Sequence, residues 1–260
     1  MPSPELKITI LGSGTCVPSL KRSSCSVLVE TGSQKILMDA GPGTMRRLLE
    51  SGNEIFDITY MIFSHFHPDH ISELVPFIFA NKYPNSARRK KPLTLIGGKG
   101  FINFFNGLKN VFGEWIELSP GLINILELDN KKHCTMNFHQ FCLESIPVKH
   151  RPESIAIKIK SLQNYSIVYS GDTDFSENLI SLASDANLLI CESAVPDNQK
   201  VPGHLTPSLA GKIATQARVP FLVLTHFYPE CDLVDIKKQC RNTYDGRLVL
   251  GEDLLFFELP

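Results

Sequence analysis

The chain of 260 residues lacks an excess of charge of either sign, because 26 lysines and arginines oppose 27 acidic residues. A protein that binds nucleic acid through its whole surface is usually basic, so strong nonspecific binding is not expected. The seven cysteines form no CxxC pair, which predicts reduced and mostly buried thiols. No window approaches the roughly 18 apolar residues of a membrane span, and the N-terminus does not resemble a signal peptide. We therefore expect a cytoplasmic protein with no membrane association.

Hydrophobic residues make up 43% of the chain and charged residues 20%, which is ordinary globular usage. Strand-like runs dominate, and helical segments fall in two separated groups. No repeat, low-complexity tract or linker interrupts them. This pattern predicts an α/β fold of two sheets packed face to face with helices outside, in one domain over residues 1–260.

Several local expectations follow from the same patterns. A helix is expected over 71–81 and a single strand over 136–143. Residues 82–92, with the basic run Arg88–Lys91, are expected to form an exposed loop. Trp115 is expected in the core, and Thr206 is expected to cap a helix that begins at Pro207.

A histidine-rich run, Ser-His-Phe-His-Pro-Asp-His, follows an apolar strand and is the strongest functional signal. Side chains repeat every second residue in an extended segment, so His65 and His67 point the same way. Pro68 ends that segment, so Asp69 and His70 serve a different point in space. Imidazole and carboxylate both suit zinc and its neighbours. The run therefore predicts two metal ions, in preference to a solvated loop that is histidine-rich by chance.

Three further candidate ligands end other strand-like segments. His150 follows Val-Lys, Asp172 lies in Ser-Gly-Asp-Thr, and His226 follows Val-Leu-Thr. Any one of them is equally well explained as an ordinary turn residue or cap. Together they supply the ligands that a two-metal site still needs.

The motif HxHxDH, followed by a separate His, an Asp and a late His, resembles the metallo-β-lactamase superfamily from Leu11 to about Pro229. The opening Leu-Gly-Ser-Gly-Thr-Cys-Val-Pro-Ser over 11–19 and Asp-Ala-Gly-Pro-Gly over 39–43 are similar to its ribonuclease Z-like, phosphodiesterase branch. The resemblance implies a four-layer αβ/βα sandwich with two mixed β-sheets and outer helices. Dimers are common in the family it resembles, so a homodimer is compatible, and the sequence leaves the oligomeric state open.

The resemblance further implies a dinuclear centre in which a hydroxide between the ions is the nucleophile. It assigns the ligands as follows: His65, His67 and His150 to one ion, Asp69, His70 and His226 to the other, and Asp172 to both. Asp69 is thereby expected to serve catalysis as well as binding. All seven ligands are nitrogen or oxygen donors, so zinc is expected, and manganese, iron and cobalt are also compatible.

Two more residues match that branch. His204, in Gly-His-Leu-Thr-Pro, corresponds to a histidine that contacts the scissile phosphate and protonates the leaving oxygen. Glu192, in Ile-Cys-Glu-Ser, corresponds to the acid that orients it. A carboxylate fixes the tautomer of an imidazole and raises its pKa, as such an acid requires. The alternative is that His204 merely precedes the next helix.

The spacing of the ligands bears on the substrate. Members that process tRNA carry a long arm between the positions of His150 and Asp172, which here are only 22 residues apart. We therefore expect a small phosphodiester, such as a cyclic nucleotide or a short nucleotide diester, with RNA not favoured. The alternatives are a tRNA 3′-end endonuclease of the ribonuclease Z type, a thioester or lactone hydrolase of the glyoxalase II kind, and a non-catalytic RNA-binding or scaffold protein.

Overall fold

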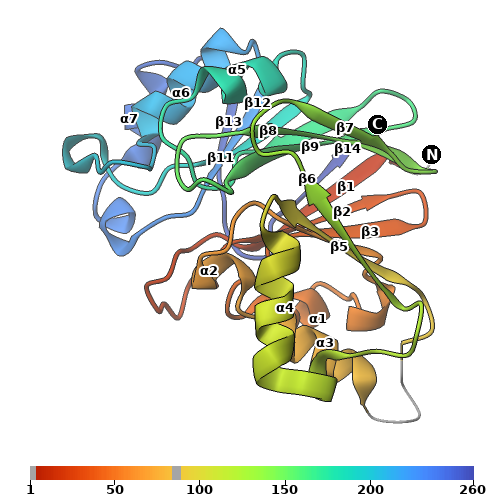
Figure 1. Ribbon diagram of the computed structural model, residues 1–260. Helices are drawn as coiled ribbons and strands as arrows, with labels where there is room; N and C mark the ends of the chain where they lie inside the picture. Colours follow the sequence, from red (N-terminus) through yellow and green to blue (C-terminus); the bar gives the residue numbers. More distant parts are fainter. Residues whose placement is uncertain (1–3, 84–88) are drawn as a thin grey trace.

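The computed structural model describes residues 4–83 and 89–260. Within these residues two mixed seven-stranded sheets face each other, and helices cover both outer faces (Figure 1). This is the predicted αβ/βα sandwich of four layers. None of the described helices is long and apolar enough to cross a bilayer.

The first sheet has the order β14-β1-β2-β3-β4-β5-β6. Its strands are β1 (Leu6–Gly12), β2 (Ser26–Thr31), β3 (Gln34–Met38), β4 (Tyr60–Phe63), β5 (Leu93–Gly98), β6 (Ile123–Leu128) and β14 (Phe256–Leu259). Pairing is parallel from β3 to β6 and antiparallel among β14, β1, β2 and β3. The carboxyl ends of β3 and β4 therefore lie at one edge of the sheet.

The second sheet has the order β13-β12-β11-β10-β9-β8-β7. Its strands are β7 (Cys134–Asn137), β8 (Phe141–Pro147), β9 (Ile155–Ser161), β10 (Ser166–Tyr169), β11 (Leu188–Glu192), β12 (Phe221–Thr225) and β13 (Arg247–Leu250). Strands β10 to β13 are parallel, and β7 to β10 are antiparallel. Four parallel carboxyl ends again meet at one edge.

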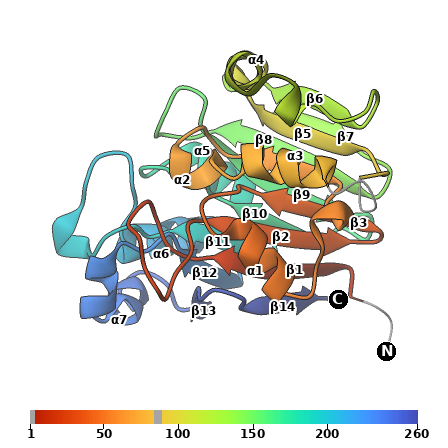
Figure 2. The same ribbon diagram turned by 90° about the horizontal axis from the view of Figure 1, so that it is seen from below.

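Three apolar layers hold the sandwich together. One cluster fills the space between the sheets, and Ile10, Ile62, Ile157 and Val223 belong to it. The others lie under the outer helices. The helices are α1 (Thr44–Glu50), α2 (Pro68–Ile71), α3 (Leu74–Lys82), α4 (Phe101–Phe112), α5 (Glu177–Ala183), α6 (Pro207–Gln216) and α7 (Ile236–Arg241). Helices α1, α3 and α4 cover the first sheet, and α5 to α7 cover the second (Figures 1 and 2).

Two predicted elements are divided in the structure. The helix expected over 71–81 is two helices, α2 and α3, separated at Ser72 and Glu73. The strand expected over 136–143 is the end of β7, a turn and the start of β8, which pair antiparallel. In both cases an apolar pattern continues across a turn, so periodicity alone could not place the break.

Arg89 of the basic run and Trp115 differ from expectation, whereas Lys90 and Lys91 are exposed as expected. Arg88 lies outside the described residues, but Arg89 is only 3% exposed. Its guanidinium donates to Asn81 Oδ1 and to the carbonyls of Ile58 and Ile55 at 2.7–2.8 Å. Trp115 is 50% exposed and packs edge-on against a ring of α3 rather than in the core.

Candidate metal centre

The parallel strand ends bring the predicted ligands together. His65 lies just after β4, Asp172 just after β10 and His226 directly after β12, while His150 lies in the turn between β8 and β9. One ligand atom each from His65, His67, His150 and Asp172 falls within 4.8 Å of the others, and so do atoms from Asp69, His70 and His226. The structure thus joins all seven predicted side chains in two adjacent groups.

Asp172 lies between the two groups. Its Oδ2 is 3.7 Å from His65 Nε2 and 3.9 Å from His150 Nε2. Its Oδ1 is 3.3 Å from Nε2 of both His70 and His226. Each carboxylate oxygen therefore faces a different group, as a bridging ligand requires. Although burial opposes it, His226 and His70 lower the pKa of Asp172 well below its usual value, so this carboxylate is ionised.

Hydrogen bonds outside the cluster orient the imidazoles. His150 Nδ1 donates to the carbonyl of Gly203 at 2.9 Å, because a carbonyl can only accept. His70 Nδ1 lies 2.7 Å from Asp39 Oδ2 and donates to it. In both rings Nδ1 therefore carries a proton, and Nε2 is the atom that faces the centre. Burial lowers the pKa of His65 well below its ordinary value and also lowers the pKa of His150, so these rings are neutral.

The buried polar atoms allow a test of whether a metal fits. Within the described residues, His65 Nε2 is buried and has no hydrogen-bond partner, and Asp172 Oδ1 is buried and makes no hydrogen bond although the two imidazole nitrogens of His70 and His226 lie 3.3 Å away. Leaving such atoms unsatisfied costs free energy, which a cation at this point would remove. The donors are imidazole nitrogens and carboxylate oxygens, a set that suits zinc and its neighbours. The residues therefore fit a divalent metal.

Asp39, to which the sequence analysis assigned no role, supports this centre from behind. It follows β3 and is fully buried. Its Oδ1 accepts from Ser64 N at 2.7 Å, and its Oδ2 accepts from Ser64 Oγ, His70 Nδ1 and Tyr169 OH at 2.7–2.8 Å. Ser64 Oγ is in turn 3.1 Å from His65 Nδ1. In the sequence, Asp39 is marked only by its place after a strand-like run and by the Asp-Ala-Gly-Pro-Gly motif that it begins.

Two backbone features shape the strand ends. His226 has a φ of 61°, an uncommon conformation outside glycine that clusters at functional sites. Gly171 has a φ of 55°, and a Cβ there would lie 2.6 Å from Ser64 Cβ. Only glycine fits between Ser64 and Asp172 without moving the backbone.

The predicted pair of His204 and Glu192 lies beside the same centre. His204 Nδ1 is 3.1 Å from Glu192 Oε1 and 3.9 Å from Asp172 Oδ2. Glu192 is 1% exposed at the end of β11, and it also accepts from the backbone N–H groups of Thr173 and Leu205. Burial lowers the pKa of His204, but the hydrogen bond and charge of Glu192 outweigh it and raise the pKa to about 9.

The helix cap predicted next to His204 is wrong in one respect. Thr206 occupies the N-cap position of α6, but its side chain makes no capping hydrogen bond. His204 lies three residues before the start of α6, so its place in the chain fits the alternative as well as the predicted role.

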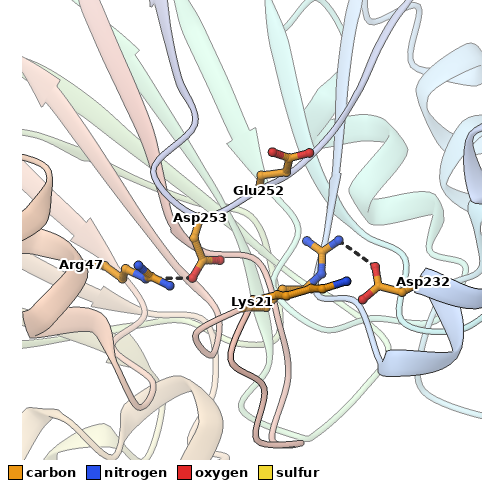
Figure 3. A pocket seen from close by; sticks show the side chains of 6 residues that line it. Lys21, Arg47, Asp232, Glu252 and Asp253 are labelled. Atoms are coloured by element: carbon orange, nitrogen blue, oxygen red, sulfur yellow. Dashed lines mark hydrogen bonds and ion pairs between the residues drawn. The ribbon is translucent and has the colours of Figure 1, made fainter.

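The loop between β1 and β2, residues 13–25, borders the centre and is anchored by buried charge. Asp253 accepts from the N–H groups of Ser13 and Ser23 at 2.7–2.9 Å. It also pairs with Arg47 at 3.0 Å, and Figure 3 shows these two side chains pointing toward each other in a charged cavity. Arg22 on the loop pairs with Asp232 at 3.0 Å, and both residues line the same cavity. The base of the loop is thus held in place from the C-terminal part of the chain.

The fold and the grouped histidines and aspartates define a member of the metallo-β-lactamase superfamily of hydrolases, in its ribonuclease Z-like branch. Within it, the chain belongs to the family described as Anti-Pycsar protein Apyc1, whose pattern matches residues 6–206.

Known proteins resemble the chain over nearly its full length. Ribonuclease Z of Mycobacterium bovis (strain BCG / Pasteur 1173P2) is 28% identical over 276 residues, with 96% of each chain covered. The metallo-beta-lactamase fold protein YhfI from Bacillus subtilis superposes with a TM-score of 0.83 at 21% identity, covering 98% of this chain and 100% of that one. The short form of human tRNase Z superposes with a TM-score of 0.81 at 23% identity, covering 98% of this chain and 99% of that one. At these identities the two structures show the fold alone.

Proposed function

We propose that the protein is a metal-dependent phosphodiesterase that cleaves small phosphodiesters, either a cyclic nucleotide or a short nucleotide diester. The observation that carries this proposal is the buried Glu192 hydrogen-bonded to His204, 3.9 Å from Asp172. An imidazole oriented by a carboxylate is suited to protonate a leaving oxygen. An alkoxide leaves poorly without such a proton, whereas a thiolate does not need one.

Two divalent cations, with zinc expected, complete the proposed site. His65, His67 and His150 would hold one, Asp69, His70 and His226 the other, and Asp172 both. When bound, such a pair supplies Lewis-acid stabilisation of phosphoryl oxygens and makes water a stronger nucleophile at neutral pH.

The chain's own residues would then orient the substrate and supply a proton. Glu192 holds His204 Nδ1 at 3.1 Å, so Nε2 of that ring is left to face a substrate. Stacking of His204 on His226, with ring centroids 5.6 Å apart and planes at 12°, fixes the ring further. His204 would hold a proton at Nε2 and give it to the departing oxygen.

The cavity beside the centre suits a small substrate. It has a volume of about 570 Å³ and lies between the β1–β2 loop, α1 and Asp69. Pockets for small ligands commonly measure about 300–1,000 Å³. Val17, Pro42 and Pro68 offer apolar contact, and Arg46 offers a positive charge. Between His150 and Asp172 the chain forms only β9 and β10, so no tRNA-binding arm is inserted at that place.

A substrate panel on metal-loaded protein tests the proposal. Bis(4-nitrophenyl) phosphate, 3′,5′- and 2′,3′-cyclic nucleotides, a precursor tRNA, a thioester and a lactone are compared at equal enzyme concentration. We expect turnover of the small diesters. Turnover confined to the precursor tRNA would favour the ribonuclease Z alternative, and turnover confined to the thioester or lactone would favour the glyoxalase II type.

His204→Ala then tests the acid. We expect a loss of about 10²–10⁴-fold with cyclic nucleotides, the usual contribution of general acid catalysis. The loss should be much smaller with bis(4-nitrophenyl) phosphate, because nitrophenolate leaves without protonation. His133→Ala is a matched control, since His133 also pairs with a glutamate, at 2.9 Å, but is exposed. Equal losses with both substrates would contradict the acid assignment.

A further inference from the structure

Tyr228 lies at the edge of the candidate centre without an assigned role. It comes two residues after His226, and its ring is nearly perpendicular to two imidazoles of the site. The planes meet at 77° with His226 and 78° with His204, with centroids 6.2 and 6.5 Å away. Within the described residues the phenol oxygen has one hydrogen-bond partner, Cys16 Sγ at 3.5 Å. A polar group beside the proposed acid is thus held by a weak partner only.

The backbone around Tyr228 ties it to the loop that carries His204. Tyr228 N donates to the carbonyl of Ala194 at 3.0 Å, and Ala194 N donates to the carbonyl of Leu205 at 3.1 Å. Phe227 N also donates to the carbonyl of Ser13 at 3.0 Å. These main-chain hydrogen bonds link the backbone of Tyr228 to the segment that carries His204. Such preorganisation is what a transition-state contact requires.

We propose that the Tyr228 hydroxyl donates a hydrogen bond to a non-bridging phosphoryl oxygen of the substrate. The inference rests on the proposed phosphodiesterase function. A thiol is a poor acceptor, whereas a phosphate oxygen is a strong one, so substrate displaces Cys16 from the phenol. The described residues give the phenol no carboxylate partner, whereas His204 has Glu192. Proton transfer to the leaving oxygen therefore belongs to His204, and Tyr228 provides a neutral donor.

Tyr228→Phe removes the hydroxyl and keeps the ring. We expect kcat to fall by about 100-fold, as when one donor to a developing oxyanion is removed. The factor should be the same for a cyclic nucleotide and for bis(4-nitrophenyl) phosphate, because the non-bridging oxygens are common to both. Tyr244→Phe is the control, since its buried hydroxyl donates to the carbonyl of Val219 at 3.0 Å in the apolar layer under the helices of the second sheet.

Inorganic phosphate provides a readout that does not depend on turnover. We expect metal-loaded Tyr228→Phe to bind phosphate at least about tenfold more weakly than wild type by calorimetry, with unchanged metal content. Equal phosphate binding, a loss confined to the cyclic nucleotide, or loss of metal from the variant would each overturn the inference. If the wild type cleaves no diester but Tyr228→Phe still weakens phosphate binding, the proposed function fails and the contact stands.

Discussion

Replacing Asp39 by asparagine tests how far the support behind the metal centre determines metal binding. The carboxylate accepts four hydrogen bonds, from Ser64 N, Ser64 Oγ, His70 Nδ1 and Tyr169 OH, all at 2.7–2.8 Å. An asparagine side chain of the same shape has one accepting oxygen and one donating NH₂ group. Whichever way it is placed, the NH₂ group meets a donor. The charge that orients His70 and increases its basicity is also lost.

The expected losses of metal affinity and of apoprotein stability follow from these contacts. Partners that orient a ligating histidine are typically worth 10–100-fold in metal affinity. At about 1.4 kcal/mol per factor of ten, this corresponds to about 1.4–2.8 kcal/mol of binding free energy. Stability of the apoprotein should also fall, by about 1.5–3 kcal/mol, because a hydrogen bond to a buried charge is lost. The two effects are separate and are measured separately.

Zinc affinity is measured by competition with a chelator, and unfolding of the apoprotein by urea titration. Asp253→Asn is the matched control, because Asp253 is also a nearly buried carboxylate that accepts from backbone, hydroxyl and arginine donors. Its hydrogen bonds come from Ser13, Ser23 and Arg47, none of which is a predicted ligand, so the variant should lose stability but keep zinc affinity. Wild-type zinc affinity in Asp39→Asn, or an equal loss of affinity in both variants, would refute the reasoning.

Gly171→Ala should lower both zinc affinity and the unfolding free energy by more than about 1 kcal/mol, since the new Cβ would collide with Ser64 and the backbone has a positive φ. Its control is Gly107→Ala, where the new Cβ meets nothing within 4 Å. A neutral effect of Gly171→Ala would contradict the geometry. Arg89→Met should lower the free energy of unfolding in urea by about 2–4 kcal/mol, because buried carbonyls lose their donor. Lys90→Met, at an exposed position, should change that free energy little. Equal stability of the two variants would show that the burial of Arg89 is unimportant. Cys16, the exposed thiol, should react first with a disulfide reagent at pH 8. Burial raises the pKa of Cys231 and Cys240 to about 12, so they stay protonated and slow until the pH nears that value; a fast phase that survives in Cys16→Ala would contradict this.

Much of the candidate site follows from sequence alone, because its ligands sit where strand-like runs end. The histidine-rich run needs only the period of an extended chain to pair His65 with His67, and a proline to separate Asp69 and His70 from them. The order of the remaining ligands then follows from a resemblance that covers most of the chain. The two-sheet architecture is predictable for the same reason, since apolar runs and their grouping are local properties.

Tertiary structure alone decided the contacts between distant segments. Asp39 forms hydrogen bonds with His70, which is 31 residues away in the sequence, and with Tyr169, which is 130 residues away. Tyr228 forms a hydrogen bond with Cys16, which is 212 residues away. The burial of Arg89 likewise depends on carbonyls some 31 and 34 positions away, whereas its sequence neighbours are charged. Local pattern carries no information about which polar groups meet after folding, because hydrogen bonding depends on position in space rather than on separation along the chain.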